Sequence, residues 1–426
     1  MSWPTVRNPS FARRPEMPLV LIAHSPFLLT LWAPRLIAGI GSTYAWVLIS
    51  LTLLFLSGRL WPQDVGPFAK PLAGLLALPT LSLAAWLVFR VAYTGADSDE
   101  YFVLYFAFFT LALLPACIIA GPLGMAHPMW RVLLEANLAI ATIVMVPLAI
   151  FEWITGTPLL APSLIVEDGQ ARAAVGQLHP IILALMFALT AATTPLIRRR
   201  WLRWCSLILL TCGVMATNSQ GQMFAIFVAI ALSVSKRVRH FLARNAKAMV
   251  GCIVSALVMI SCTYPRRSIP GDTLAELSSN YRGVLMAQIP VILAERPFGY
   301  GFGGIPFGKF VAESAWGAVD LSHSLDSELV VWAILTGFVG LAAYAWFTYV
   351  ALKGLSRSYW MGSLLLFVLL VSGLTVALFA WINVAMLFAL LIAVALDGSL
   401  PNGEAKPRSH RIRRRGAFRS GSTPTR

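Results

Sequence analysis

Residues able to hold a phosphate and move a proton gather in one weakly hydrophobic stretch, 264–328. Within it, Arg282 is followed by an apolar run and Arg296 by a glycine-rich segment. A guanidinium can bind a phosphate through two parallel hydrogen bonds. His323 and Asp326 close the stretch, and a histidine beside a carboxylate is a common general base with its orienting partner. If the chain does chemistry, we expect it here.

Each of these residues also has an interpretation without chemistry. The apolar run after Arg282, 284–293, is interrupted by Pro290, and we interpret it as a short interfacial helix. An arginine at its start could instead reach the phosphates of the lipid. His323 and Asp326 share a helical face only if a helix has begun there, and a helix cap supplied by Ser324 or Asp326 explains the same residues. The pattern leaves both interpretations open.

Two other motifs are weaker. Gly299, Gly301 and Gly304 match the pattern GxGxxG, but no strand–helix unit surrounds them, which excludes a dinucleotide-binding fold. We expect these glycines to permit positive φ in a tight turn, with a phosphate-binding nest as the alternative. The acidic cluster at 97–100 carries hard oxygen ligands, but a single cluster without a second partner favours a solvated loop over a metal site.

The elements that must position these residues are membrane helices. Of 426 residues, 58% are hydrophobic and 12% charged, and the mean hydropathy is +0.75. A soluble domain has too little interior for that much apolar surface, and several segments match the thickness of a bilayer core. Helices satisfy their own backbone groups in lipid, so we predict an all-α, polytopic membrane protein. The five cysteines form no CxxC pair, which argues against a zinc site.

We predict about twelve transmembrane helices within one membrane domain, 18–397, between a polar segment, 1–17, and a basic disordered tail, 398–426. The predicted spans are 18–34, 36–58, 71–93, 101–120, 132–154, 178–197, 204–218, 221–235, 248–264, 328–351, 359–376 and 379–397.

Charge distribution predicts the sidedness. With the N-terminus inside, alternation puts most of the 33 Lys and Arg residues on the cytoplasmic side, together with both termini. The loop 264–328 then faces outward, as do 155–177 and the turn 218–221. The formal charge of +15 is read as a topology signal, and the tail as an anchor for anionic lipid rather than for nucleic acid.

Four segments, in this order, resemble motifs of the O-antigen ligase and polysaccharide polymerase superfamily. The similarity covers roughly 165–345, and its segments run from Arg172 to His179-Pro180, from Thr217 to Gly221, from Arg282 through Glu295 and Arg296 to Gly301, and from His323 through Asp326 to Gly337 and Gly340.

The chain departs from the family pattern at two points. Gln220 stands where the family turn usually carries an arginine. His323 lies about one helical turn too far from Gly337, so that the family's histidine position falls on Asp326, where polymerases of this group often have aspartate. Either residue is therefore a candidate for the catalytic position.

The resemblance implies a membrane glycosyltransferase of the GT-C type whose donor is an oligosaccharide linked to undecaprenyl diphosphate. Arg172, Arg282, Arg296 and Gln220 would bind the lipid diphosphate, and His323 or Asp326 would accept the proton of the acceptor hydroxyl. His179 and Glu295 are secondary candidates. The implied enzyme needs no cofactor and no metal, which further weakens a metal site at 97–100.

The resemblance further implies a place in the bacterial inner membrane, with both termini cytoplasmic and a periplasmic active site. We expect polymerisation of exopolysaccharide or O-antigen repeat units, acting with chain-length regulator and flippase proteins. The alternative within the family is a ligase that moves the glycan chain to lipid A-core in lipopolysaccharide biosynthesis. A polysaccharide transporter or flippase is a third reading, disfavoured because polar residues gather at helix ends rather than at the midplane.

Overall fold

The protein is seen in a computed structural model. It describes residues 28, 31–32, 128–159, 165–167, 170–177, 179–197, 199–271, 274–300, 305–306, 308–315, 317–321, 327–357, 360–376, 384 and 387. The predicted segments 1–17 and 398–426, the acidic cluster 97–100, His323 and Asp326 lie outside the described residues.

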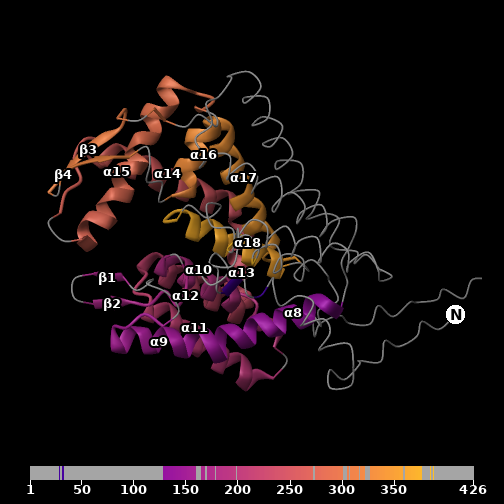
Figure 1. Ribbon diagram of the computed structural model, residues 1–426. Coiled ribbons are helices and arrows are strands. Elements are labelled where there is room, and N and C mark those ends of the chain that lie inside the picture. The colour runs from indigo at the N-terminus through magenta and orange to yellow at the C-terminus, as the bar shows by residue number, and fades with distance from the viewer. Residues whose placement is uncertain are drawn as a thin grey trace, which may run out of the picture.

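The described part of the chain is mainly helical, as predicted from composition (Figure 1). Its helices are α8 (Pro128–Ala139), the π-helix η3 (Ile140–Met145), α9 (Val146–Thr155), α10 (Pro180–Ala191), the 3-10 helix η4 (Thr194–Leu196), α11 (Arg200–Ala216), α12 (Gln220–Val234), α13 (Lys236–Arg244), α14 (Ala246–Thr263), α15 (Leu274–Glu295), α16 (Glu328–Thr336), α17 (Phe338–Gly354) and α18 (Trp360–Gly373). Two antiparallel hairpins were not predicted: β1 (Ile165–Glu167) with β2 (Gln170–Arg172), and β3 (Val311–Ser314) with β4 (Gly317–Asp320).

Seven predicted spans coincide with described helices: 132–154, 178–197, 204–218, 221–235, 248–264, 328–351 and 359–376. Within the part of the chain that the structure describes, two helical segments are long and apolar enough to cross a bilayer, Leu134–Thr155 and Ala246–Thr263, and a third candidate combines α12 with α13. The other five predicted spans lie outside the described residues, apart from single positions, so a count of twelve stays a prediction.

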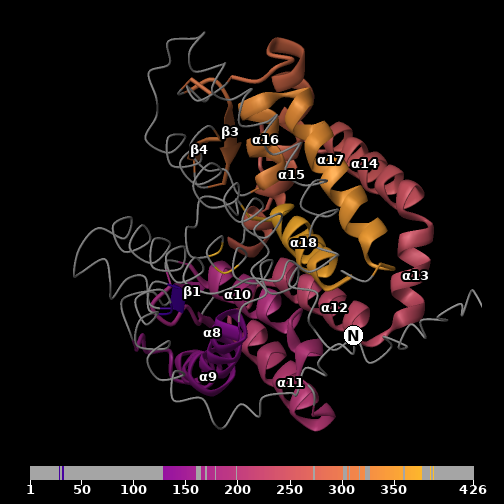
Figure 2. The ribbon, with the colours of Figure 1, turned by 90° about the vertical axis from the view of Figure 1, so that its right-hand side faces the viewer.

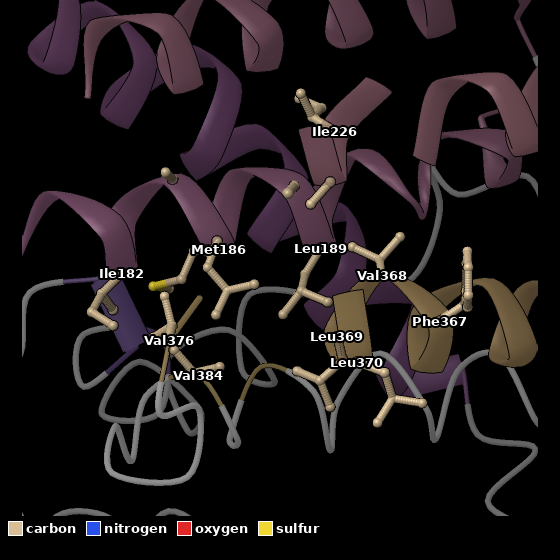
Figure 3. Packing of buried hydrophobic residues seen from close by; sticks show 14 of the residues in the cluster. Ile182, Met186, Leu189, Ile226, Phe367, Val368, Leu369, Leu370, Val376 and Val384 are labelled. Carbon is tan, nitrogen blue, oxygen red and sulfur yellow. The ribbon is translucent and has the colours of Figure 1, made fainter. Parts of the chain in front are cut away.

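Helix α10 forms the centre of the core. Within it all residues but Ile181 are buried, because α11, α12 and α18 pack around it. Side chains of α10 such as Met186 and Leu189 meet Val368 of α18 and Val376 beyond it (Figure 3). An apolar helix covered on every side by other helices belongs to the interior of a helical membrane bundle.

The described helices fall into two groups joined by α18. Helices α8–α12 form one group and α14–α17 the other, and α18 packs against α10 and α12 on one side and α17 on the other (Figure 1). Both hairpins lie on the same side of the molecule, at the left of Figure 1. That side carries the polar segments that build the site described below.

The long stretch 264–328 contains a full-length helix where a short one was predicted. The predicted helix 284–293, broken at Pro290, is wrong: α15 runs from Leu274 to Glu295 with Pro290 inside it. A proline lacks the N–H that would bond the carbonyl four residues earlier, which here belongs to Met286. The Ser261 hydroxyl donates to this Met286 carbonyl at 2.9 Å, so α14 supplies the missing hydrogen bond and α15 continues.

The chain after α14 returns along α15 and joins the second hairpin. Gln288 Nε2 donates to the Arg266 carbonyl at 2.7 Å, and Asn280 Nδ2 donates to the Pro270 carbonyl at 2.7 Å. Beyond that, the Ile269 N–H donates to the Glu313 carbonyl at 2.7 Å, which attaches the segment to β3. The described part of this loop is therefore a folded unit built on α15.

At Gly299 and Gly337 the backbone of this unit packs directly against the break between α16 and α17. Both have positive φ, 79° and 61°. The Tyr300 N–H donates to the Ile334 carbonyl at 2.6 Å, and the Phe338 N–H to the Pro297 carbonyl at 2.9 Å. At Gly299, the GxGxxG motif thus serves a close backbone approach, and the Tyr300 N–H that a phosphate nest would use is bonded to protein.

We predict that Gly299→Ala destabilises the protein more than Gly308→Ala. A Cβ at Gly299 would lie 2.6 Å from Ile334 and Leu335 backbone atoms, whereas one at Gly308, with φ of 74°, has nothing within 4 Å. Positive φ destabilises both variants by about 1–2 kcal/mol. Only Gly299→Ala also pushes its own backbone away from that of Ile334 and Leu335. Thermal unfolding of the purified variants measures the difference, and equal midpoints would contradict this close packing.

Candidate functional site

The site is built around the turn between α11 and α12. Thr217 is the C-cap residue of α11 and Ser219 the N-cap residue of α12, and both are buried. Asn218 between them has a φ of 50°, a conformation that asparagine tolerates better than most residues. This left-handed residue reverses the chain within one turn, so the last carbonyls of α11 and the start of α12 lie side by side.

Arg172 is held against this turn. It ends β2, and its Nε donates to the Thr217 carbonyl at 3.2 Å while a terminal nitrogen lies 3.4 Å from the Ser219 hydroxyl. The backbone follows, because the Ala173 N–H donates to the Ala216 carbonyl at 3.1 Å. These two acceptors are neutral, and both bonds orient the half-buried guanidinium.

A buried carboxylate fixes the backbone that follows Arg172. Glu152, near the end of α9, has no exposed surface. One carboxylate oxygen accepts from the N–H groups of Ala174 at 3.0 Å and Val175 at 2.9 Å, and the other from Leu159 at 3.0 Å. Val175 has a φ of 43°, so the carboxylate stabilises a turn that the chain would not adopt unaided. Charge-assisted bonds of this kind are the strong ones.

Arg282 approaches the same turn from the other helix group. It lies within α15, not at a helix start as predicted, and its Nε donates to the Thr375 carbonyl at 3.2 Å. Thr375, just beyond α18, packs on the first turn of α12, where a Cβ on Gly221 would lie 2.7 Å from its hydroxyl. The Tyr264 ring covers Gly283, the next residue of α15, so closely that a Cβ there would clash with it.

The start of α12 therefore lies near two arginines from distant parts of the chain, Arg172 through the turn before it and Arg282 through Thr375. Gln220, its first residue, is exposed there. A helix N-terminus near guanidinium groups is a chemically suitable place for a phosphate or diphosphate group.

The start of α16 reaches the same place. Its N-cap residue is Ser327, so the caps predicted at Ser324 or Asp326 are wrong. The Glu328 N–H donates to the carbonyl of Val376, the neighbour of Thr375, at 3.2 Å. Glu328 itself is buried and accepts from Trp332 Nε1 at 2.6 Å. The candidates His323 and Asp326 precede this helix start but lie outside the described residues.

The end of α15 forms a separate polar cluster. Lys309 forms an ion pair with Glu295, whose carboxylate also accepts from the Tyr300 hydroxyl at 2.7 Å. The hydrogen bond from Lys309, then that from Tyr300, lowers the pKa of Glu295, and the Glu295 bond raises the pKa of Lys309. These contacts favour a structural role for Glu295. Arg296 is exposed beside it.

The remaining secondary candidate is a helix cap. His179 is the N-cap residue of α10, and its Nδ1 accepts from the Ile181 N–H at 3.2 Å. An imidazole nitrogen that accepts carries no proton, so the ring proton lies on Nε2. Among the described residues no group of three His, Cys, Asp or Glu side chains could hold a metal ion. The acidic cluster 97–100 stays untested, and metal independence stays a prediction.

Sequence reasoning found both arginines but missed the groups that hold them. Glu152 lies near the end of the predicted span 132–154 and was not among the candidate residues. The sequence could have indicated its role, because a carboxylate within a predicted membrane span needs hydrogen-bond partners. Nothing in the sequence could single out the Thr375 carbonyl as the partner of Arg282, because every residue has a backbone carbonyl.

The fold and the site define a helical membrane protein in which two arginines bind carbonyls at or just beyond the ends of other helices. Residues 205–345 match the model of the family described as O-antigen ligase. This segment of the chain is similar to the O-antigen ligase family, and the match confirms the resemblance found in the sequence. No curated protein and no solved structure matched the chain.

We predict that Glu152→Ala loosens the turn that follows Arg172. Each orphaned buried N–H costs about 1–3 kcal/mol, and Glu152→Gln, which keeps one acceptor oxygen, loses less. Hydrogen exchange of 172–177 measures the effect and rises most in the alanine variant. The matched control is Glu135→Gln, which changes an exposed carboxylate near the start of the same span. Unchanged protection in Glu152→Ala would contradict this role.

Proposed function

We propose that the protein is a glycosyltransferase that transfers an oligosaccharide from undecaprenyl diphosphate at the periplasmic face of the inner membrane. The observation that carries the proposal is that Arg172 and Arg282 both lie near the start of α12, Arg282 through Thr375. The family match supports the same class of reaction. The donor diphosphate binds beside the two guanidinium groups, with Gln220 at the helix start. Arg296 belongs to the separate cluster at the end of α15.

In the proposed reaction the acceptor hydroxyl oxygen attacks the anomeric carbon of the donor sugar. The bond from that carbon to the diphosphate oxygen breaks, and the electron pair leaves with the diphosphate. Arg172 and Arg282 stabilise the charge that develops on this leaving group. His323 or Asp326, just before α16, accepts the acceptor's proton. The proposed step uses no metal and no cofactor.

Polarity of the helix ends supports the periplasmic assignment. Helix α12 begins at the candidate site and ends at the basic helix α13. Basic residues mark the cytoplasmic side of membrane proteins. The opposite end, with Arg172 and Arg282, then faces the periplasm, and both termini are assigned to the cytoplasm.

We favour polymerisation of exopolysaccharide or O-antigen repeat units, because Asp326 occupies the position at which polymerases of the family often carry aspartate. The second candidate is a ligase that uses lipid A-core as acceptor, and the description of the matched family, O-antigen ligase, favours it. The donor is the same in both reactions. Chain-length regulator and flippase proteins are the proposed partners of the polymerase.

We predict that Arg172→Ala and Arg282→Ala each abolish long-chain polysaccharide without lowering the amount of protein in the membrane. Loss of a charge-assisted contact to a transition state costs about 3 kcal/mol, or more than a hundredfold in rate. A polysaccharide gel and an immunoblot measure both quantities. The control is Arg267→Ala, an exposed loop residue whose backbone carbonyl, which the substitution keeps, accepts from the Glu313 N–H. Polymer of full length in both site variants would rule out the assignment.

A deletion strain separates the two reactions. We predict that loss of the protein leaves single repeat units on lipid A-core, or no exopolymer, as expected of a polymerase. Long chains that accumulate on the lipid carrier would instead show a ligase. The readout is a polysaccharide gel together with extraction of lipid-linked glycans, and complementation with the intact gene is the control.

A further inference from the structure

Helix α13 is a basic helix that turns away from the membrane span before it. It follows α12 after Ser235, and the two axes differ by 104°. Its nine residues include Lys236, Arg237, Arg239 and Arg244. A helix with so many cations does not cross a bilayer, so the bent pair is a span, α12, followed by a helix that lies nearly at right angles to it. Figure 2 shows α13 between α12 and α14 at the edge of the molecule.

Arg239 fixes how α13 lies against the bundle. Its guanidinium stacks over the Trp360 ring at 3.8 Å from the centroid and donates to the Leu232 carbonyl at 2.9 Å, in the last turn of α12. Ala243, four residues after Arg239 in the same helix, is buried. The side that carries Arg239 and Ala243 therefore faces α17 and α18, and the opposite side faces outward.

The outward side combines exposed cations with exposed apolar side chains. Arg237, Arg244 and Lys247 are exposed. Beside them Phe241 is 62% and Val238 40% exposed. Residues 237, 241 and 244 recur at intervals of four and three, which places them along one side of the helix.

A second segment adds charge to this surface. Lys353, near the end of α17, and Arg357, in the connection to α18, are both exposed. The Trp360 N–H donates to the Arg357 carbonyl at 3.2 Å, so this connection lies next to the ring that Arg239 covers. Neither contributing segment, 169–271 or 329–396, contains an aspartate or glutamate.

We propose that this surface, formed by Arg237, Phe241, Arg244, Lys247, Lys353 and Arg357, binds the headgroups of anionic phospholipids. The cations match lipid phosphates, and Phe241 and Val238 reach the depth of the first acyl carbons, as in helices that lie in the membrane interface. A soluble polyanion would use the cations but leave the exposed apolar side chains in water. The combination of the two therefore selects a lipid surface.

The position along the spans agrees with this occupant. Helix α14 has 18 residues, or about 27 Å at 1.5 Å per residue. It begins beside α13 and ends at Tyr264, which packs on Gly283 next to Arg282. The lipid surface and the candidate transfer site thus lie about one hydrocarbon thickness apart, at opposite membrane interfaces. The proposal is independent of the transfer reaction.

The test measures lipid retention by the purified full-length protein in neutral detergent, with native mass spectrometry as the readout. The probes are dioleoylphosphatidylglycerol and dioleoylphosphatidylcholine. Wild-type protein retains the anionic lipid preferentially. Removing two cations in the double variant Arg237→Gln/Arg244→Gln weakens binding of phosphatidylglycerol about twentyfold to thirtyfold. Binding of phosphatidylcholine does not change.

The matched control is Arg266→Gln/Arg267→Gln, which removes the same charge from exposed positions at the other end of α14. It leaves retention of phosphatidylglycerol at the wild-type level. If the first double variant does not fold, Lys353→Gln/Arg357→Gln makes the same test on the second segment. Equal loss in the control, no loss in either α13 or α17 variant, or displacement of the lipid by an equal concentration of inorganic phosphate would each overturn the proposal.

Discussion

The hydrogen bond from Arg172 to the Thr217 carbonyl shows the constraint on which much of the structure depends: the last carbonyls of a helix need donors from outside that helix. The last carbonyls of any helix have no partner within that helix. At a membrane interface, where water is scarce on the bundle side, another donor must satisfy them. Arg172 does so at the end of α11, Arg282 just beyond α18 and Arg239 in the last turn of α12. The negative end of each helix dipole also favours a cation there.

The converse arrangement secures the backbone that carries Arg172. The Glu152 carboxylate accepts hydrogen bonds from three backbone N–H groups. The backbone next to Arg172 is therefore held by a carboxylate, while the Arg172 side chain itself is held by the Thr217 carbonyl. The Gly299–Gly337 contact similarly joins the folded loop to α16 and α17 through backbone atoms. Backbone groups make these contacts. The backbone around the proposed phosphate site therefore does not depend on the residue at position 220, where Gln220 replaces the family's usual arginine.

Charge is distributed along the helices in a way that suits transfer at a membrane surface. Arg172 and Arg282 lie on the side of the two hairpins, where the proposed lipid-linked diphosphate would meet an acceptor from water. The basic helix α13 and the α17–α18 connection lie at the other ends of α12 and α14. Exposed cations without acidic neighbours in their own segments suit the lipid interface, whereas half-buried cations on helix carbonyls suit a bound ligand.

The sequence by itself determined the membrane class, the seven spans that coincide with described helices and the family resemblance, because hydrophobic length and motif order are local properties of the chain. It also singled out Arg172 and Arg282, since cations are conspicuous in apolar sequence. Only the tertiary structure decided what holds them. The length of α15 depended on a hydroxyl from α14 that replaces the hydrogen bond lost at Pro290. The meeting of Arg172, Arg282 and the start of α12 depended on the carbonyls of Thr217 and Thr375. A backbone carbonyl looks the same at every residue, so its role is fixed by the fold around it and not by the side chain that the sequence records.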